Sequence, residues 1–178
     1  AVTSDTDTVA YRTDVSPNGN HATQVDAAKE PLARTDSEFY DGTDDWLEAP
    51  LSVIDSTSKS LTVVAAAYWQ ADSHFGSILG TSSLSGFDRL LARGGGLSIQ
   101  AFVRLSDGTR VFKTFSTIPS VGWHIFRYQW DESTKTLGIG VDGVFETATS
   151  ALGRNDLPGS DLTRIGHGAN TGTHGWED

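Results

Sequence analysis

The sequence contains no cysteine and no methionine. Without cysteine the chain can form no disulfide and offers neither a thiolate metal ligand nor a cysteine nucleophile. Apolar runs are short, since the longest spans residues 63–69 whereas a membrane-spanning helix needs about 20 residues. No apolar segment preceded by basic residues opens the chain either. We therefore expect no membrane insertion.

Basic residues are scarce. The chain has 13 Lys and Arg against 23 Asp and Glu, which gives a formal net charge of -10. A negative surface repels phosphate backbones, so nucleic acid is not an expected partner. An acidic surface also keeps a protein soluble at high salt, which is compatible with an extracellular setting.

The residues that are present suffice for a folded domain. The 178 residues fit a single core, and 37% of them are apolar, including 5 Trp and 8 Phe. The chain begins at Ala1 rather than at a methionine. We interpret residues 1–178 as one domain that is part of a longer protein.

Alternating apolar and polar residues predict an all-β fold. Residues 97–105 alternate, turn at Asp107-Gly108 and continue through residues 109–115, as a hairpin with one solvated face would. Residues 61–70 are apolar on both faces, which predicts a central strand. No window keeps a helical pattern beyond about ten residues. This combination is typical of a β-sandwich.

A three-strand meander is predicted over residues 123–148, with a tight turn at Asp142-Gly143. In its middle strand Gly138 and Gly140 leave one face almost without side chains. Either aromatic neighbours such as Phe126 and Tyr128 or a ligand would cover that face.

The first third of the chain, residues 1–50, is rich in Asp, Thr, Ser and Asn and shows little periodicity. Only residues 8–12 and 38–40 look extended. We expect long loops that lie on the core.

Four short blocks carry a family resemblance. They read S-P-N-G-N-H-A-T-Q at residues 16–24, Y-D-G-T-D-D-W-L at 40–47, W-H at 123–124 and V-D-G at 141–143. In order and spacing they resemble the laminin-G-like branch of the concanavalin A-like lectin and glucanase superfamily, in its bacterial and phage form. The resemblance implies a jelly-roll sandwich of two antiparallel sheets.

The chain departs from the family pattern in two ways. Pro17 stands where the family usually has Gly, and the family's first and last strands have no counterpart at either end of the chain. We expect a domain incomplete at both termini, with sheet edges that other polypeptide covers.

The resemblance implies several functions, since members bind glycans or proteins, accompany enzymes or form parts of virions, and fold does not fix function. We predict a non-catalytic module that binds carbohydrate within a larger extracellular or phage protein. One alternative is a structural virion protein, such as a decoration, fibre or spike domain, that assembles with neighbouring chains. Another is a polysaccharide-cleaving hydrolase or lyase.

Motifs for catalysis are missing from the sequence. None of the glutamates starts the E-x-D-x-x-E run that places two carboxylates on one strand face in glucanases of the superfamily. The G-x-S-x-G, H-E-x-x-H and G-x-x-x-x-G-K-[ST] patterns are absent too. We therefore expect no enzyme, although a lyase assembled from separate strands would leave no such motif.

Two groups of residues are candidate metal ligands. Asp41, Asp44 and Asp45 could supply oxygen ligands to calcium, which many relatives hold, or could make a turn and local hydrogen bonds. His21, His167 and His174 lie in Gly- and Asn-rich loops, where they are either zinc ligands or ordinary hydrogen-bonding side chains.

Sugar recognition normally uses exposed aromatic rings that stack on the apolar faces of sugars. The candidates for such ligand binding are Trp46, Trp69, His74 and Trp176, with Tyr68 beside them, although Trp69 could instead belong to the core. Trp123 is set aside, because in the family it packs inside the sandwich.

Overall fold

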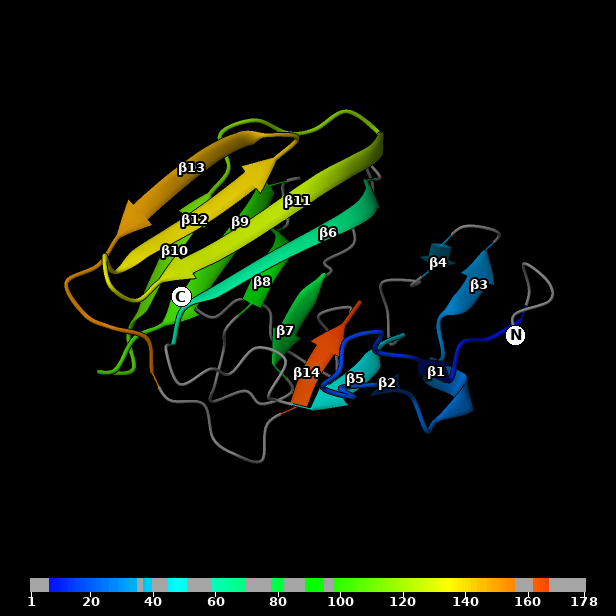
Figure 1. Cartoon of the computed structure of the whole chain (residues 1–178). Helices are drawn as coiled ribbons and strands as arrows, with labels where there is room; N and C mark the ends of the chain where they lie inside the picture. The colour runs from blue at the N-terminus through cyan, green and yellow to red at the C-terminus, as the bar shows by residue number, and fades with distance from the viewer. Residues whose placement is uncertain are drawn as a thin grey trace.

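Antiparallel β-strands make up nearly all of the regular structure (Figure 1). The structure is a computed structural model, and it describes residues 7–34, 37–39, 45–50, 59–69, 78–81, 89–94, 98–155 and 162–166. Within these ranges the one helical segment is a 3-10 turn, η1 (Ala27–Lys29). No helix of the described chain is long and apolar enough to cross a membrane. The all-β prediction is confirmed.

One sheet contains four strands in the order β13-β12-β11-β6. The strands are β6 (Leu61–Trp69), β11 (Gly122–Asp131), β12 (Thr136–Val141) and β13 (Val144–Thr149), and every neighbouring pair is antiparallel. The last three are consecutive in the chain, so the predicted meander is confirmed.

The prediction that residues 61–70 form a central strand is wrong for the described part, because β6 is the last strand in the order of its sheet and pairs only with β11. Its inward residues meet the core, while Val64 and Tyr68 point outward and are exposed. The strand is apolar on both sides because the outer surface of the sheet is itself apolar.

A second layer packs against this sheet. It contains β8 (Arg89–Gly94), β9 (Ser98–Arg104) and β10 (Arg110–Thr114) in the order β10-β9-β8, and β9 and β10 contact β12. The β9–β10 pair is the hairpin predicted around Asp107-Gly108. Figure 1 shows the two layers one behind the other, which is a sandwich-like arrangement.

Shorter strands extend the second layer. The strand β7 (Leu79–Thr81) contacts β8 and belongs to a sheet of order β1-β2-β5-β14-β7. Its other members are β1 (Tyr11–Arg12), β2 (Ala22–Thr23), β5 (Leu47–Pro50) and β14 (Leu162–Ile165). The strands β3 (Leu32–Arg34) and β4 (Ser37–Phe39) form a separate antiparallel pair.

The first third of the chain is therefore more regular than its composition predicts. It forms a small core of its own from Val9, Ala22, Ala33, Leu47 and Ala49, against which Ile165 also packs. Because these strands have two to four residues each, alternation had too few positions to be visible in the sequence.

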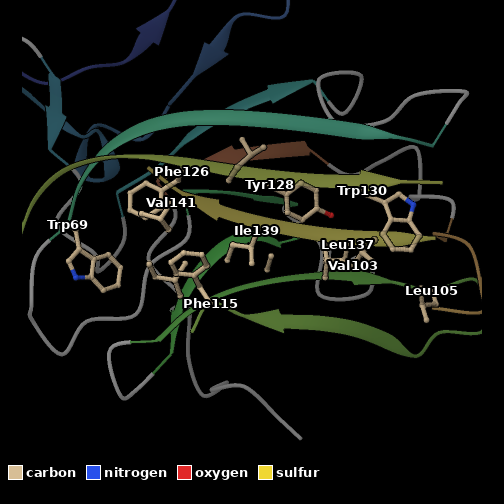
Figure 2. Packing of buried hydrophobic residues seen from close by; sticks show 13 residues of the cluster. Trp69, Val103, Leu105, Phe115, Phe126, Tyr128, Trp130, Leu137, Ile139 and Val141 are labelled. Carbon is tan, nitrogen blue, oxygen red and sulfur yellow. The ribbon is translucent and has the colours of Figure 1, made fainter. Parts of the chain in front are cut away.

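The main core lies between the two layers (Figure 2). The sheet of β6 and β11–β13 contributes Phe126, Tyr128, Trp130, Leu137, Ile139 and Val141, and the facing layer contributes Ile99, Ala101, Val103 and Leu105. Each such large side chain stabilises the fold by about 1.5–3 kcal/mol relative to exposure. On β11 the side chains of residues 126, 128 and 130 are therefore buried, and those of the residues between them point away from the core.

Candidate functional site

The outer surface of the four-stranded sheet carries a continuous group of exposed apolar side chains. Strand alternation turns these residues away from the core, because the residues between them are the ones that pack inward. We call this surface the exposed aromatic face; its apolar members are Val64, Tyr68, Trp123, Ile125 and Phe145, and the charged Arg127 lies among them.

Trp123 and Tyr68 form the centre of one end of this face. They lie directly opposite each other on β11 and β6, with ring centres 5.8 Å apart and ring planes at 82°. Trp123 is 57% exposed and Tyr68 49% exposed. An edge-to-face pair of this kind holds both rings in place while leaving ring surface open to solvent.

The expectation that Trp123 packs inside the sandwich is therefore wrong. The physical reason is the register of β11: with Phe126, Tyr128 and Trp130 buried, an odd-numbered residue of the strand must point outward. The same alternation, read from the sequence, could have placed Trp123 outside.

Phe145 covers the glycines of β12. A Cβ added at Gly138 would lie 2.1 Å from Phe145 Cζ, and one at Gly140 would lie 2.9 Å from Phe145 Cδ2. Of the two alternatives considered for the bare glycine face, the structure shows the first, in which an aromatic side chain of the chain itself covers it. The residue differs, because Phe126 and Tyr128 point into the core and the ring comes from the next strand instead.

Arg127 lies on top of this arrangement. Its guanidinium carbon is 4.7 Å from the centre of the Phe145 ring, and its Nη2 donates a hydrogen bond of 2.7 Å to Gln129 Oε1. Stacking and hydrogen bonding together restrict the long side chain to one part of the face. The sheet thus presents a cation at a defined position between aromatic groups.

His124, next to Trp123 on β11, hydrogen-bonds to two other segments at this end of the sheet. Its Nδ1 lies 2.6 Å from Asp142 Oδ2 and its Nε2 lies 2.8 Å from the Ser120 carbonyl oxygen. Both partners are acceptors, so the imidazolium, which donates from both nitrogens, is the form that satisfies them. The Asp142 carboxylate accordingly raises the pKa of His124, and the hydrogen bond from His124 lowers the pKa of Asp142.

Asp142 also forms the predicted tight turn. Its φ is 48° and that of Gly143 is 86°, the two positive values that a type I′ hairpin turn requires. The second carboxylate oxygen, Oδ1, accepts a 2.9 Å hydrogen bond from the Ile125 amide. Two of the resemblance blocks, W-H and V-D-G, are therefore in direct contact.

Three of the five candidates for sugar binding lie inside the described chain, of which Trp46 and Trp69 are buried and Tyr68 is half-exposed. Trp46 is 7% exposed, with Lys29 Nζ 4.9 Å and the Arg164 guanidinium 4.6 Å from its ring centre. Trp69 is 9% exposed and packs beside Phe126 in the main core. Trp69 is thus a core residue, which was the alternative considered for it. The other two, His74 and Trp176, lie outside the described residues.

The predicted metal ligands are only partly described. Asp45 is buried beside Trp46, whereas Asp41 and Asp44 lie outside the described ranges. His21 Nδ1 accepts a 3.0 Å hydrogen bond from the Asp14 amide, and its predicted companions His167 and His174 are not described. In the described portion, no three His, Asp or Glu side chains are gathered as a metal site.

No protein-family model matches this chain, and no curated protein matches it significantly. Function must therefore be inferred from the chemistry of its own surfaces.

Proposed function

We propose that this chain is a non-catalytic recognition module that binds carbohydrate through the exposed aromatic face, within a larger extracellular or virion protein. The observation that carries the proposal is the Trp123–Tyr68 pair, two half-exposed rings side by side on a regular sheet. Single exposed apolar residues are common on proteins, but exposed aromatic and aliphatic side chains that lie side by side on one surface often mark a binding site.

The physical fit to a sugar has two parts. Aromatic rings offer a flat apolar surface for the C–H faces of a pyranose, and they lose little side-chain entropy because the sheet already holds them. Gln129 and Arg127, on the same face of β11, supply polar groups that can bond hydroxyls. This combination of apolar surface and a few fixed polar groups is typical of small-ligand and glycan sites.

We further propose that the fold is the jelly-roll of the laminin-G-like family. Two antiparallel layers around one main core support the assignment. So does the contact between His124 and Asp142, since it joins two sequence blocks that the family shares. By the same resemblance, the residues proposed to hold calcium are Asp41, Asp44 and Asp45.

Assembly with other protein chains is the second candidate function. Val64 and Ile125 are 61% and 51% exposed and lie on the same face as the aromatic pair. Aliphatic side chains contribute little to sugar binding, but contiguous apolar surface is a common feature of protein interfaces. A virion component that associates with neighbouring chains would use the face in this way.

The test compares Trp123→Ala with Phe112→Ala. Phe112 is an equally exposed aromatic residue, but it lies on β10 in the other layer. Binding to a glycan array, followed by calorimetry with and without calcium, is expected to be weakened about tenfold or more by Trp123→Ala and unchanged by Phe112→Ala.

Two outcomes would contradict carbohydrate binding. One is that no glycan binds the unaltered protein with better than about millimolar affinity. The other is that sedimentation shows a defined oligomer that Trp123→Ala dissociates while glycan binding is absent, which would assign the face to assembly.

A further inference from the structure

We propose that the exposed aromatic face selects an acidic glycan, with the carboxylate of a uronic acid residue bound by Arg127 and a neighbouring sugar stacked on Trp123 and Tyr68. This inference rests on the proposed carbohydrate-binding function and specifies the class of ligand.

The first argument is the charge pattern of the sheet. The chain as a whole has a net charge of -10, yet the outward positions of β6, β12 and β13 carry no charge. On β11 Arg127 is the one charged residue between Trp123 and Gln129. The face therefore has a positive centre in an acidic protein.

The carboxylates at the two ends of this face have partners of their own. Asp142 receives hydrogen bonds from His124 and from the Ile125 amide. Asp131, at the last position of β11, accepts from the amides of Ser133 and Thr134 and from the Ser133 hydroxyl. Neither is placed to neutralise Arg127, and no ion pair of Arg127 is formed within the described chain.

The second argument is that Arg127 is held ready for an anion. Gly138 and Gly140 let the Phe145 ring approach the strand closely, and the Arg127 guanidinium lies over that ring. Of the five N–H donors that an arginine has, Nη2 is engaged with Gln129. The planar fork that remains matches a carboxylate, and its fixed position lowers the entropic cost of binding.

The third argument is the spacing. Trp123 and Arg127 are four residues apart on one strand, so their positions are separated by roughly 13 Å at about 3.3 Å per residue. A ligand that stacks on Trp123 and pairs with Arg127 is therefore longer than one sugar ring. The face fits an oligosaccharide or polymer better than a free monosaccharide.

The net negative charge of the protein does not oppose this assignment. Exposed charges more than about 8 Å apart are largely screened at physiological salt, so the local charge of the face decides the interaction. A nucleic acid, by contrast, needs several phosphate contacts to basic residues, and this face offers one.

The experiment uses pairs of polymers that share a sugar backbone and differ in whether they carry an anionic group. Polygalacturonate is compared with its fully methyl-esterified form, and alginate with carboxyl-reduced alginate, by calorimetry and affinity electrophoresis. Dextran sulfate and dextran form a third pair that separates sulfate from carboxylate. The variants are Arg127→Gln, Arg127→Lys and, as the control, Arg110→Gln, an arginine stacked on Phe102 in the other layer.

The expected result is that at least one uronate polymer binds more tightly than its uncharged partner. Arg127→Gln is expected to weaken that binding about ten- to a hundredfold, the equivalent of one charge-assisted hydrogen-bonded pair. Arg127→Lys is expected to retain part of the affinity, because it keeps the charge without the fork. Added salt is expected to weaken binding in the unaltered protein more than in Arg127→Gln.

The failure of this inference is distinguishable from failure of the proposed function. Equal binding of charged and uncharged partners, or an acid preference that survives Arg127→Gln, would overturn the acidic-glycan assignment and leave carbohydrate binding standing. Preference for dextran sulfate alone would overturn the uronate assignment. Binding of no polymer or array glycan at all would overturn both proposals.

Discussion

At the scale of single residues, the absence of a side chain decides the shape of the exposed aromatic face. Gly138 and Gly140 leave space above β12 because they have no side chain. The Phe145 ring of β13 occupies that space, and Arg127 of β11 stacks on the ring. Each step depends on the one before it. A methyl group added at Gly138 is therefore expected to displace the Phe145 ring and, with it, the Arg127 side chain.

The substitution Gly138→Ala tests this dependence. The new Cβ would occupy the place of Phe145 Cζ, so the ring must swing away, and the coupling free energy between positions 138 and 145 is expected to be about 1 kcal/mol. In a Phe145→Ala background the same change is expected to be neutral or stabilising, because alanine orders a strand better than glycine. Urea unfolding of the four proteins measures the cycle, and equal effects in both backgrounds would contradict the packing described.

At the scale of elements, one histidine joins the turn between β12 and β13 to β11, in addition to the backbone pairing of β11 with β12. His124 donates to Asp142 in the turn and to the Ser120 carbonyl ahead of β11, and Asp142 also accepts from the Ile125 amide. The contact fixes the end of the sheet on which Trp123 lies. Its strength depends on the charge of both groups, so it is expected to depend on pH.

The sign of that dependence follows from the two pKa shifts. The pKa of His124 is raised above 6.5, so its contribution to stability is complete below pH 6.5 and is lost as the pH rises through the raised value. The pKa of Asp142 is lowered below 3.8, so its contribution is complete above pH 3.8 and is lost as the pH falls through the lowered value. The pair is thus expected to stabilise the fold most between pH 3.8 and 6.5.

The measurement compares the unaltered protein with His124→Gln. Denaturant unfolding is expected to show the largest difference in free energy near about pH 5 and a smaller difference near about pH 9, where the imidazole is neutral. A difference that stays constant over this range would show that the imidazolium form plays no part.

At the scale of the whole molecule, the two layers are joined at one edge by an ion pair as well as by the core. Glu146 on β13 accepts from Lys113 Nζ at 2.8 Å and from the Ser116 amide at 2.9 Å, both from β10 and the residues after it. These hydrogen bonds lower the pKa of Glu146 from its ordinary value of 4.5 to about 2. The ionised carboxylate of Glu146 therefore stabilises the contact between the two layers at this edge.

Glu146→Gln is expected to reduce stability at neutral pH. The loss is expected to shrink as the pH falls from 4.5 towards about 2, because the contribution of a carboxyl with a lowered pKa is present above its ordinary value and disappears on protonation. Unfolding curves at several pH values, with Lys113→Met and the double variant to complete the cycle, measure it. If Glu146→Gln costs the same in the presence and absence of Lys113, the pair does not join the layers.

Much of the fold was predictable from the sequence. The hairpin around Asp107-Gly108, the meander of β11 to β13 and the Asp142-Gly143 turn were all recognised, because alternation and turn chemistry are local properties of a few residues. The short strands before Pro50 were not, since two to four residues give no measurable period.

The candidate site was harder to predict, and the reason is physical. Residues 61–69 are apolar on both sides, so the sequence by itself determined that a strand forms there but not which of its sides is covered, nor that it pairs with residues 122–130. Only the tertiary structure decided this, because the facing layer of β9 and β10 packs on the side of Phe126 and Trp130. That packing left Trp123 and Tyr68 on the surface. The tertiary structure decides this because the burial of a strand residue depends on contacts with segments far away in the chain.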